Sequence, residues 1–124
     1  MNAPLLDLSY LFEVSGGDPN YIFDVLTLFL DTVPATIAQL ERSVREMTDF
    51  DMIHRQAHSL KSSAGIIRIK DMYDDINRID ALSRDQTGKA EIVARMENVL
   101  FNFNKALPLI EAERGRNKPV EPRA

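Results

Sequence analysis

The chain has 124 residues, of which 44% are hydrophobic and 27% charged, a composition that fits one globular domain and argues against disorder. The formal net charge of −4 speaks against nucleic acid as a partner, because a phosphate-binding face usually makes a domain basic. The absence of cysteine excludes disulfides, thiolate chemistry and cysteine zinc sites.

The N-terminal residues include neither a basic segment nor a long apolar run, so we expect no signal peptide. No apolar stretch approaches the roughly 20 residues that span a membrane. These features predict a soluble, cytoplasmic protein with no membrane partner.

The first predicted helix is short. Leu8, Leu11 and Phe12 have helical spacing, Asp7 is a possible N-cap, and Gly16 with Gly17 ends the pattern. So short a helix needs packing against the rest of the molecule to be stable.

A long helix is predicted next, with Asp18 as its N-cap and Pro19 as its first residue. Its apolar residues keep one phase through Pro34, which favours one kinked helix over two separate ones. The predicted core positions follow each other in steps of three or four residues: Ile22, Leu26, Phe29, Val33, Ile37, Leu40, Val44 and Met47.

Thr48 or Asp49 can cap a third helix, which should end near Gly65. The helical period places His58 and Ser62 on a different face from the apolar residues, so we expect the histidine to lie outside the core. The apolar face consists of Phe50, Ile53, Ala57, Leu60 and Ala64.

Two more helices complete the pattern. The first has an apolar stripe of Ile69, Met72, Ile76 and Ile79, and its acids Asp71, Asp74 and Asp75 are expected to face solvent. A loop over residues 85–88 precedes the last helix, whose seam is predicted to contain Val93, Met96, Leu100, Phe103, Leu107 and Ile110.

Pro108 should kink or end this last helix, and residues 114–124 form a basic, proline-containing tail that we expect to be flexible. The predicted fold is all-α: an antiparallel four-helix bundle with a short additional N-terminal helix, in one domain over residues 1–113. We find no alternating pattern that predicts a strand.

His58 is the residue with the most useful chemistry. A free imidazole titrates near pH 6.5, so at neutral pH it is mostly an uncharged nucleophile that can accept a phosphoryl group. Lys61, one turn further, could offset part of the added negative charge. The small residues Ser62 and Gly65 would let another protein approach the ring.

The segment from His58 to Gly65, HSLKSSAG, resembles the signature of histidine-containing phosphotransfer (HPt) domains, and residues 6–11 with Gly17-Asp18-Pro19 resemble the usual start of that family. The likeness covers roughly residues 5–110. Two positions depart from the family pattern: Ser62 where glycine is frequent, and Arg68 where a small residue is common.

The resemblance implies a phosphorelay. His58 would receive a phosphoryl group from an aspartyl phosphate on a response-regulator receiver domain and pass it to a second receiver, with Lys61 as electrostatic support and Ser62 as a possible hydrogen-bond donor. A hybrid histidine kinase is the expected upstream partner. The receiver would supply Mg²⁺, so we expect no cofactor and no kinase activity in this chain, which also lacks a Walker-type loop.

Simpler interpretations stay open. His58 could be an unused surface histidine on a bundle that only docks receivers, Lys61 an ordinary solvated lysine, and Ser62 a merely tolerated small residue. His54 and His58, four residues apart, could in principle share a metal ion, but Arg55 stands where a HExxH motif has glutamate, so we expect no metal site. His54 is then a half-buried residue or one flanking the phosphate site.

Overall fold

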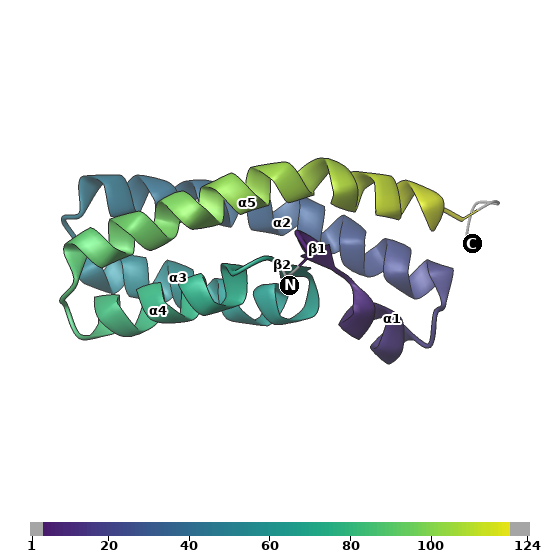
Figure 1. The fold of residues 1–124 in the computed structure, drawn as a ribbon, viewed down its shortest axis with the longest axis horizontal. Helices are drawn as coiled ribbons and strands as arrows, with labels where there is room; N and C mark the ends of the chain where they lie inside the picture. Colours follow the sequence, from purple (N-terminus) through teal and green to yellow (C-terminus); the bar gives the residue numbers. More distant parts are fainter. Residues whose placement is uncertain (1–3, 120–124) are drawn as a thin grey trace.

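The computed structural model describes residues 4–119. The elements in chain order are β1 (Leu6–Asp7), α1 (Ser9–Ser15), α2 (Pro19–Glu46), α3 (Phe50–Ile66), β2 (Arg68–Ile69), α4 (Met72–Arg84) and α5 (Lys89–Arg116). Helices α2 to α5 form an antiparallel bundle in which each packs against the next and α5 returns to α2 (Figure 1). The predicted all-α bundle with an additional N-terminal helix is confirmed.

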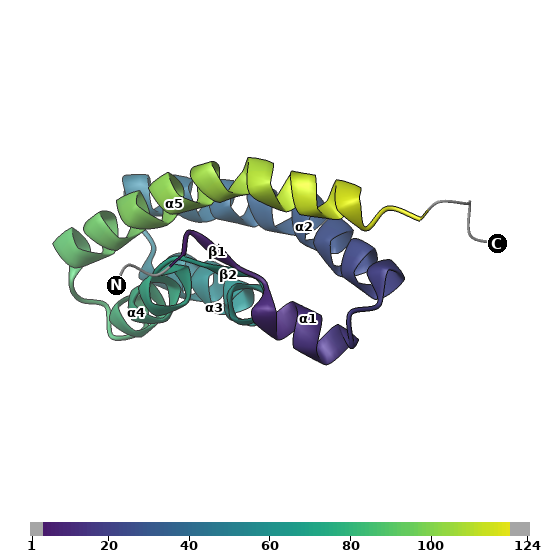
Figure 2. The same cartoon turned by 45° about the vertical axis from the view of Figure 1, so that its right-hand side comes forward.

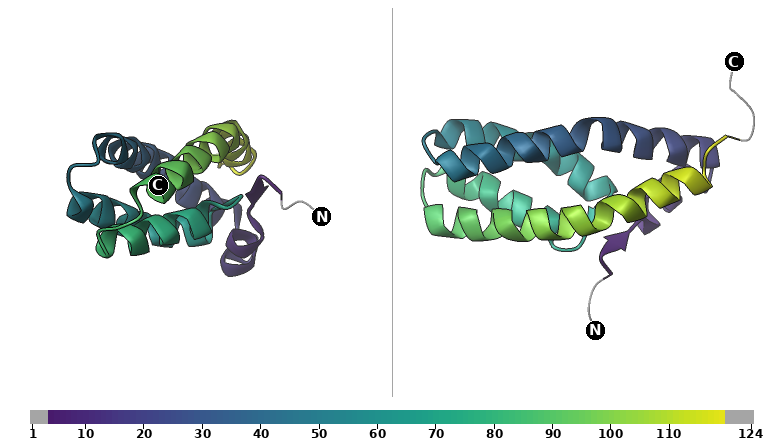
Figure 3. Two further views of the ribbon diagram at one scale, coloured as in Figure 1. Left: turned by 60° about the vertical axis from the view of Figure 1, so that its left-hand side comes forward. Right: turned by 90° about the horizontal axis from the view of Figure 1, so that it is seen from above.

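The two helix pairs differ in length, and this shapes the molecule. Helices α2 and α5 extend beyond the shorter α3 and α4, and α1 lies under the part of α2 that projects (Figures 1 and 2). Seen from above, the last turns of α5 lie beside the start of α2 (Figure 3). The histidine helix is therefore one of the short pair, with α1 near its C-terminal end.

Helix α2 is continuous through Pro34, as predicted. Asp18 caps it by accepting a hydrogen bond from the Asn20 N–H (3.0 Å), with Pro19 in the first turn. The predicted stripe is buried from Ile22 to Val44. By length and composition α2 could also span a membrane, which the sequence analysis did not anticipate, but its apolar stripe lines the bundle core.

Helix α3 begins where the capping residues predict. The Asp49 side chain accepts a hydrogen bond from the Met52 N–H (3.1 Å) and so satisfies one of the free donors of the first turn. Its buried residues are Ile53, Ala57, Leu60 and Ala64. The face that carries His58 is left outside the core, as expected.

The seam of α5 is rotated from the predicted one. Val93 is exposed, and the buried residues are Ile92, Met96, Val99, Asn102, Phe103, Ala106 and Ile110. The helix also continues through Pro108, whose ring is on an exposed position, to Arg116. Residues 114–116, which were predicted to belong to the tail, are therefore helical, and the last residues of the predicted tail, 120–124, lie outside the described residues.

A short β-pair was not predicted. Strands β1 and β2 pair antiparallel, with Leu6 opposite Ile69 and Asp7 opposite Arg68, and two-residue strands are too short to show a period of two in sequence. Asp7 is not the N-cap of α1, which is Leu8, although its carboxylate accepts a hydrogen bond from the Ser9 N–H (2.9 Å). The pair ties the N-terminal segment to the connection between α3 and α4.

Candidate functional site: a histidine above a buried carboxylate

His58 lies on the outward face of α3 with 68% of its side chain exposed. Ser62, one turn further, is also exposed, and Gly65 is half-buried on the same face. A Cβ added at Gly65 would meet the Tyr73 ring at 3.6 Å, an ordinary contact. Small residues thus follow His58 along the helix, as the sequence predicted, and the ring is open to a partner.

The ring of His58 faces a carboxylate that the sequence analysis missed. Asp80 of α4 has only 2% of its side chain exposed, and its Oδ2 lies 3.6 Å from His58 Nδ1. A carboxylate only accepts hydrogen bonds, so it favours the tautomer in which Nδ1 carries the proton. The lone pair is then on Nε2, the ring nitrogen turned away from Asp80.

Two further basic side chains of α3 contact the same carboxylate. The Lys61 ammonium forms an ion pair with Oδ2, and His54 Nδ1 lies against Oδ1. Burial acts to raise the pKa of Asp80, but hydrogen bonding and charge from Lys61, together with His54, outweigh it and hold this pKa below its ordinary value. Asp80 is therefore ionised at neutral pH and positions three basic groups.

A signal for Asp80 was present in the sequence. It stands four residues after Ile76 and next to Ile79, which places it at the edge of the apolar stripe of α4. An acid at such a position is almost never buried without a partner. What the spacing within α4 could not supply is the identity of its partners, because these come from another helix.

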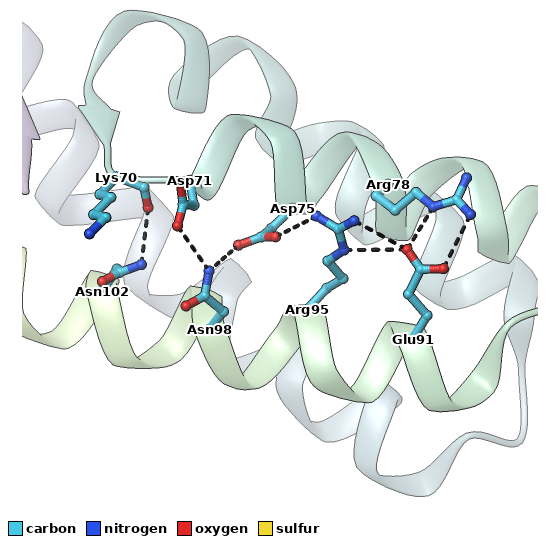
Figure 4. Close-up of polar contacts among 8 residues, drawn as sticks. All are labelled: Lys70, Asp71, Asp75, Arg78, Glu91, Arg95, Asn98 and Asn102. Atoms are coloured by element: carbon cyan, nitrogen blue, oxygen red, sulfur yellow. Dashed lines mark hydrogen bonds and ion pairs between the residues drawn. The ribbon is translucent and has the colours of Figure 1, made fainter. Parts of the chain in front are cut away.

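The expectation that Asp75 faces solvent is wrong. It is buried between α4 and α5, where the Arg95 guanidinium (3.0 Å) and the Asn98 amide (2.7 Å) each donate to one of its oxygens (Figure 4). Glu91 extends the network by binding both Arg95 and Arg78. These contacts join α4 to α5.

Arg68, the second departure from the family pattern, is turned toward the N-terminal helix. Its Nε donates to the Gly65 carbonyl (3.0 Å), one of the free acceptors at the end of α3. Its guanidinium lies over the Tyr10 ring, 4.9 Å from the centroid. Arg68 therefore connects α3 to α1.

The rings of His54 and His58 have centroids 5.9 Å apart, and both direct Nδ1 toward Asp80. Over residues 4–119, no group of three or more His, Asp or Glu side chains is arranged to hold a metal ion. The two histidines share a carboxylate in this structure.

The site is therefore an exposed histidine above a buried carboxylate on a small helical bundle. The family model of the Hpt domain matches residues 24–113, most of the chain. The chain therefore belongs to the Hpt domain family. No curated protein and no solved structure gives a significant match.

Membership of this family gives the chain a general role. It is a phosphotransfer-related helical domain of two-component signalling. Hpt domains are phosphocarrier modules that interact with receiver domains in phosphorelays, and they are not kinases.

Proposed function

We propose that this Hpt domain carries a phosphoryl group on Nε2 of His58 and relays it between aspartates of response-regulator receiver domains. The observation that carries the proposal is the exposed ring whose Nδ1 faces the buried carboxylate of Asp80 at 3.6 Å. This arrangement favours the tautomer with a free lone pair on the outward nitrogen.

In the proposed step, the Nε2 lone pair attacks the phosphorus of an aspartyl phosphate. A P–N bond forms, the acyl P–O bond breaks, and the receiver's aspartate leaves as a carboxylate. The proton on Nδ1 of His58 stays in place, and the positive charge that develops on the ring faces Asp80. Transfer to a second receiver reverses these bond changes. Positioning and charge neutralisation dominate such displacements.

Lys61 is the proposed electrostatic support. A phosphoryl group brings a charge of about −1.5 to −2, and the Lys61 ammonium is held beside the ring by its ion pair with Asp80. Ser62 is exposed one turn along from His58, and we propose it as a hydrogen-bond donor to the phosphoryl group.

The proposed partners follow from the family. The receiver domain would contribute Mg²⁺ and most of the groups that act on phosphorus, a hybrid histidine kinase would be the upstream source, and the relay would operate in the cytoplasm. This chain would then need no cofactor of its own.

A recess between α2 and α3 is the proposed contact for part of the receiver. It has a volume of about 120 Å³ and lies between α2 and α3, lined by Val25, Leu28, Ser63 and Ile66 among others. A protein interface of standard size covers about 800 Å² on each partner, which extends roughly 16 Å from its centre. Ser63 is about 7.5 Å along the helix axis from His58 and about 140° around it, so the recess is within reach of an interface centred on His58.

The test is incubation with several phosphorylated receiver domains, using wild type, His58→Ala and, as a matched control, Arg55→Gln. Arg55 is an exposed neighbour whose guanidinium pairs with Asp51 at 3.5 Å. We expect acid-labile, base-stable label on wild type and Arg55→Gln and none on His58→Ala. Receiver binding without label on any variant would support the alternative function, a non-catalytic docking bundle.

A further inference from the structure

His54 contacts the phosphoryl-acceptor site without being part of the acceptor. Its Nδ1 and Asp80 Oδ1 are both buried, and among the described residues neither has another hydrogen-bond partner. Because Oδ1 can only accept, His54 Nδ1 must carry a proton for the contact to be favourable. His54 thus occupies one oxygen of Asp80, while Lys61 and His58 face the other.

Phosphorylation would disturb the charge balance of this cluster. With both histidines uncharged, the single charge of Asp80 is matched by the single charge of Lys61. A phosphoryl group on His58 adds about −1.5 to −2 and the ring gains one positive charge, so the cluster, which now holds two anions, becomes net negative. Burial strengthens the repulsion between them, because Asp80 is shielded from water.

Of the side chains around Asp80, His54 is the one that can supply the missing charge. Imidazole is the side chain that gains a proton between pH 5 and 8, and the His54 side chain is 28% exposed, so a proton can reach it. On the other flank of α3 the charged groups of α2 are Arg42 and Glu46. Other charged neighbours have their own contacts: Asp51 with Arg55 (3.5 Å), Arg84 with Asp85 (3.7 Å), and Lys89 over the Phe50 ring (5.8 Å).

We propose that His54 is a positioning residue that takes up a proton when His58 is phosphorylated, pairs as a cation with Asp80, and so releases Lys61 to the phosphoryl group. The proton comes from solvent and binds Nε2 of His54, while the Nδ1 proton stays on His54 and is still donated to Asp80 Oδ1. A hydrogen bond becomes an ion pair, and no covalent bond other than N–H is formed. The proposal rests on the proposed function, since it needs phosphorylated His58.

The sign of the coupling follows from linkage. If the phosphorylated form holds the extra proton more tightly, then lowering the pH favours phosphorylation of His58. A rise of one unit in the titration midpoint of His54 corresponds to a tenfold change in the phosphorylation equilibrium at low pH. The effect should be lost when His54 cannot take up a proton, and it should fall to a third or less when Asp80 loses its charge.

The test is an NMR titration of both histidines before and after phosphorylation of His58 by phosphoramidate, which donates its phosphoryl group with loss of ammonia. In wild type and Arg55→Gln, we expect the His54 midpoint to rise by about one unit on phosphorylation. In Asp80→Asn, the rise should be at most a third of this. An unchanged midpoint in wild type, or an equal rise in Asp80→Asn, would overturn the proposal.

Variants of His54 supply the second readout, the phosphoryl-exchange equilibrium with a receiver at pH 6 and pH 8. His54→Gln keeps a donor without a charge and should lose the pH response attributable to His54, up to about tenfold. His54→Arg carries a fixed charge and should also lose it, but with the equilibrium shifted toward phosphorylated His58. A wild-type response in both variants would refute the role of His54.

The failures of the two proposals are distinguishable. If neither phosphoramidate nor any receiver phosphorylates His58, the proposed function fails and the role of His54 fails with it. If phosphohistidine forms at His58 while His54 does not respond, only the role of His54 is refuted.

Discussion

Asp80 decides the chemistry of the site at the scale of single residues. A buried carboxylate is stable only when it is paired and hydrogen-bonded, and here its partners are basic side chains of the neighbouring helix. One acid therefore orients the proposed acceptor His58 and holds Lys61 beside it. Stability and the proposed function are therefore linked through this carboxylate.

The stability that Asp80 contributes should depend on pH. Its pKa is lowered in the folded protein, because Lys61 and His54 outweigh the effect of burial. The contribution is therefore fully present above the unfolded value of about 3.9 and is lost as the pH falls through the lower folded value. Asp80→Asn should reduce the free energy of unfolding by about 1–3 kcal/mol at pH 7, and the difference from wild type should shrink below pH 4.

Urea unfolding at pH 7, 5 and 3 measures this difference. Asp74→Asn is the matched control, since Asp74 is an exposed acid on the same helix. A gap between wild type and Asp80→Asn that grows on acidification would contradict the expected sign.

At this scale, sequence predicted the outward position of His58 and the small residues after it, because both follow from the helical period alone. It did not predict the partner of Lys61. The contact between α3 and Asp80 joins residues about 20 positions apart, and their meeting depends on the path of the connection that includes β2. The spacing of residues within a single helix does not predict the path of that connection.

At the scale of elements, α4 joins two polar interfaces. Its Asp80 faces α3, and its Asp75 faces α5. Both acids lie at the edges of an apolar stripe centred on Ile76 and Ile79. The two buried acids fix the rotation of α4 about its axis, because turning the helix would separate each carboxylate from its hydrogen-bond donors.

Asn98→Ala should test the second interface. The Asn98 amide donates to Asp75 Oδ2 at 2.7 Å, and its removal leaves a buried charged acceptor short of a partner. We expect a loss of about 1–3 kcal/mol in the free energy of unfolding. Arg78→Ala, which removes an exposed pair with Glu91, should have a smaller effect. Equal losses in urea unfolding would show that burial of Asp75 carries no special weight.

The helices were predictable where the capping residue and the spacing of the apolar residues indicate the same helix, as in α2 and α3. The orientation of α5 was not, because Ile92 and Val93 are adjacent and either can begin an apolar stripe. The structure buries Ile92, which brings Asn102 to the Lys70 carbonyl (3.1 Å). This hydrogen bond to another segment of the chain helps to fix the rotation of α5 about its axis. The spacing of apolar residues within α5 does not reveal it.

At the scale of the whole molecule, His58 lies on the surface formed by α3, and α5 forms a separate surface of the bundle. Helix α5 packs against α2 and α4, diagonally opposite α3. Leu28 lies in the recess beside α3, and Phe101 lies on α5 below the Lys105 ammonium, 4.8 Å from its ring centroid. Both residues are 63% exposed. The two positions therefore have the same burial and differ in their location on the molecule.

Substitutions at Leu28 and Phe101 distinguish an effect on receiver binding from an effect on the stability of the domain. Leu28→Glu places a charge in the recess that an interface centred on His58 would cover, so we expect receiver affinity to fall at least tenfold. Phe101→Glu also replaces an exposed apolar side chain by a carboxylate, but on α5, and should alter affinity less than twofold. Because both positions are equally exposed, the two variants should unfold at similar urea concentrations. Calorimetric titration with a receiver gives the affinities. Equal losses of affinity, or none for Leu28→Glu, would place the receiver elsewhere than over the recess between α2 and α3.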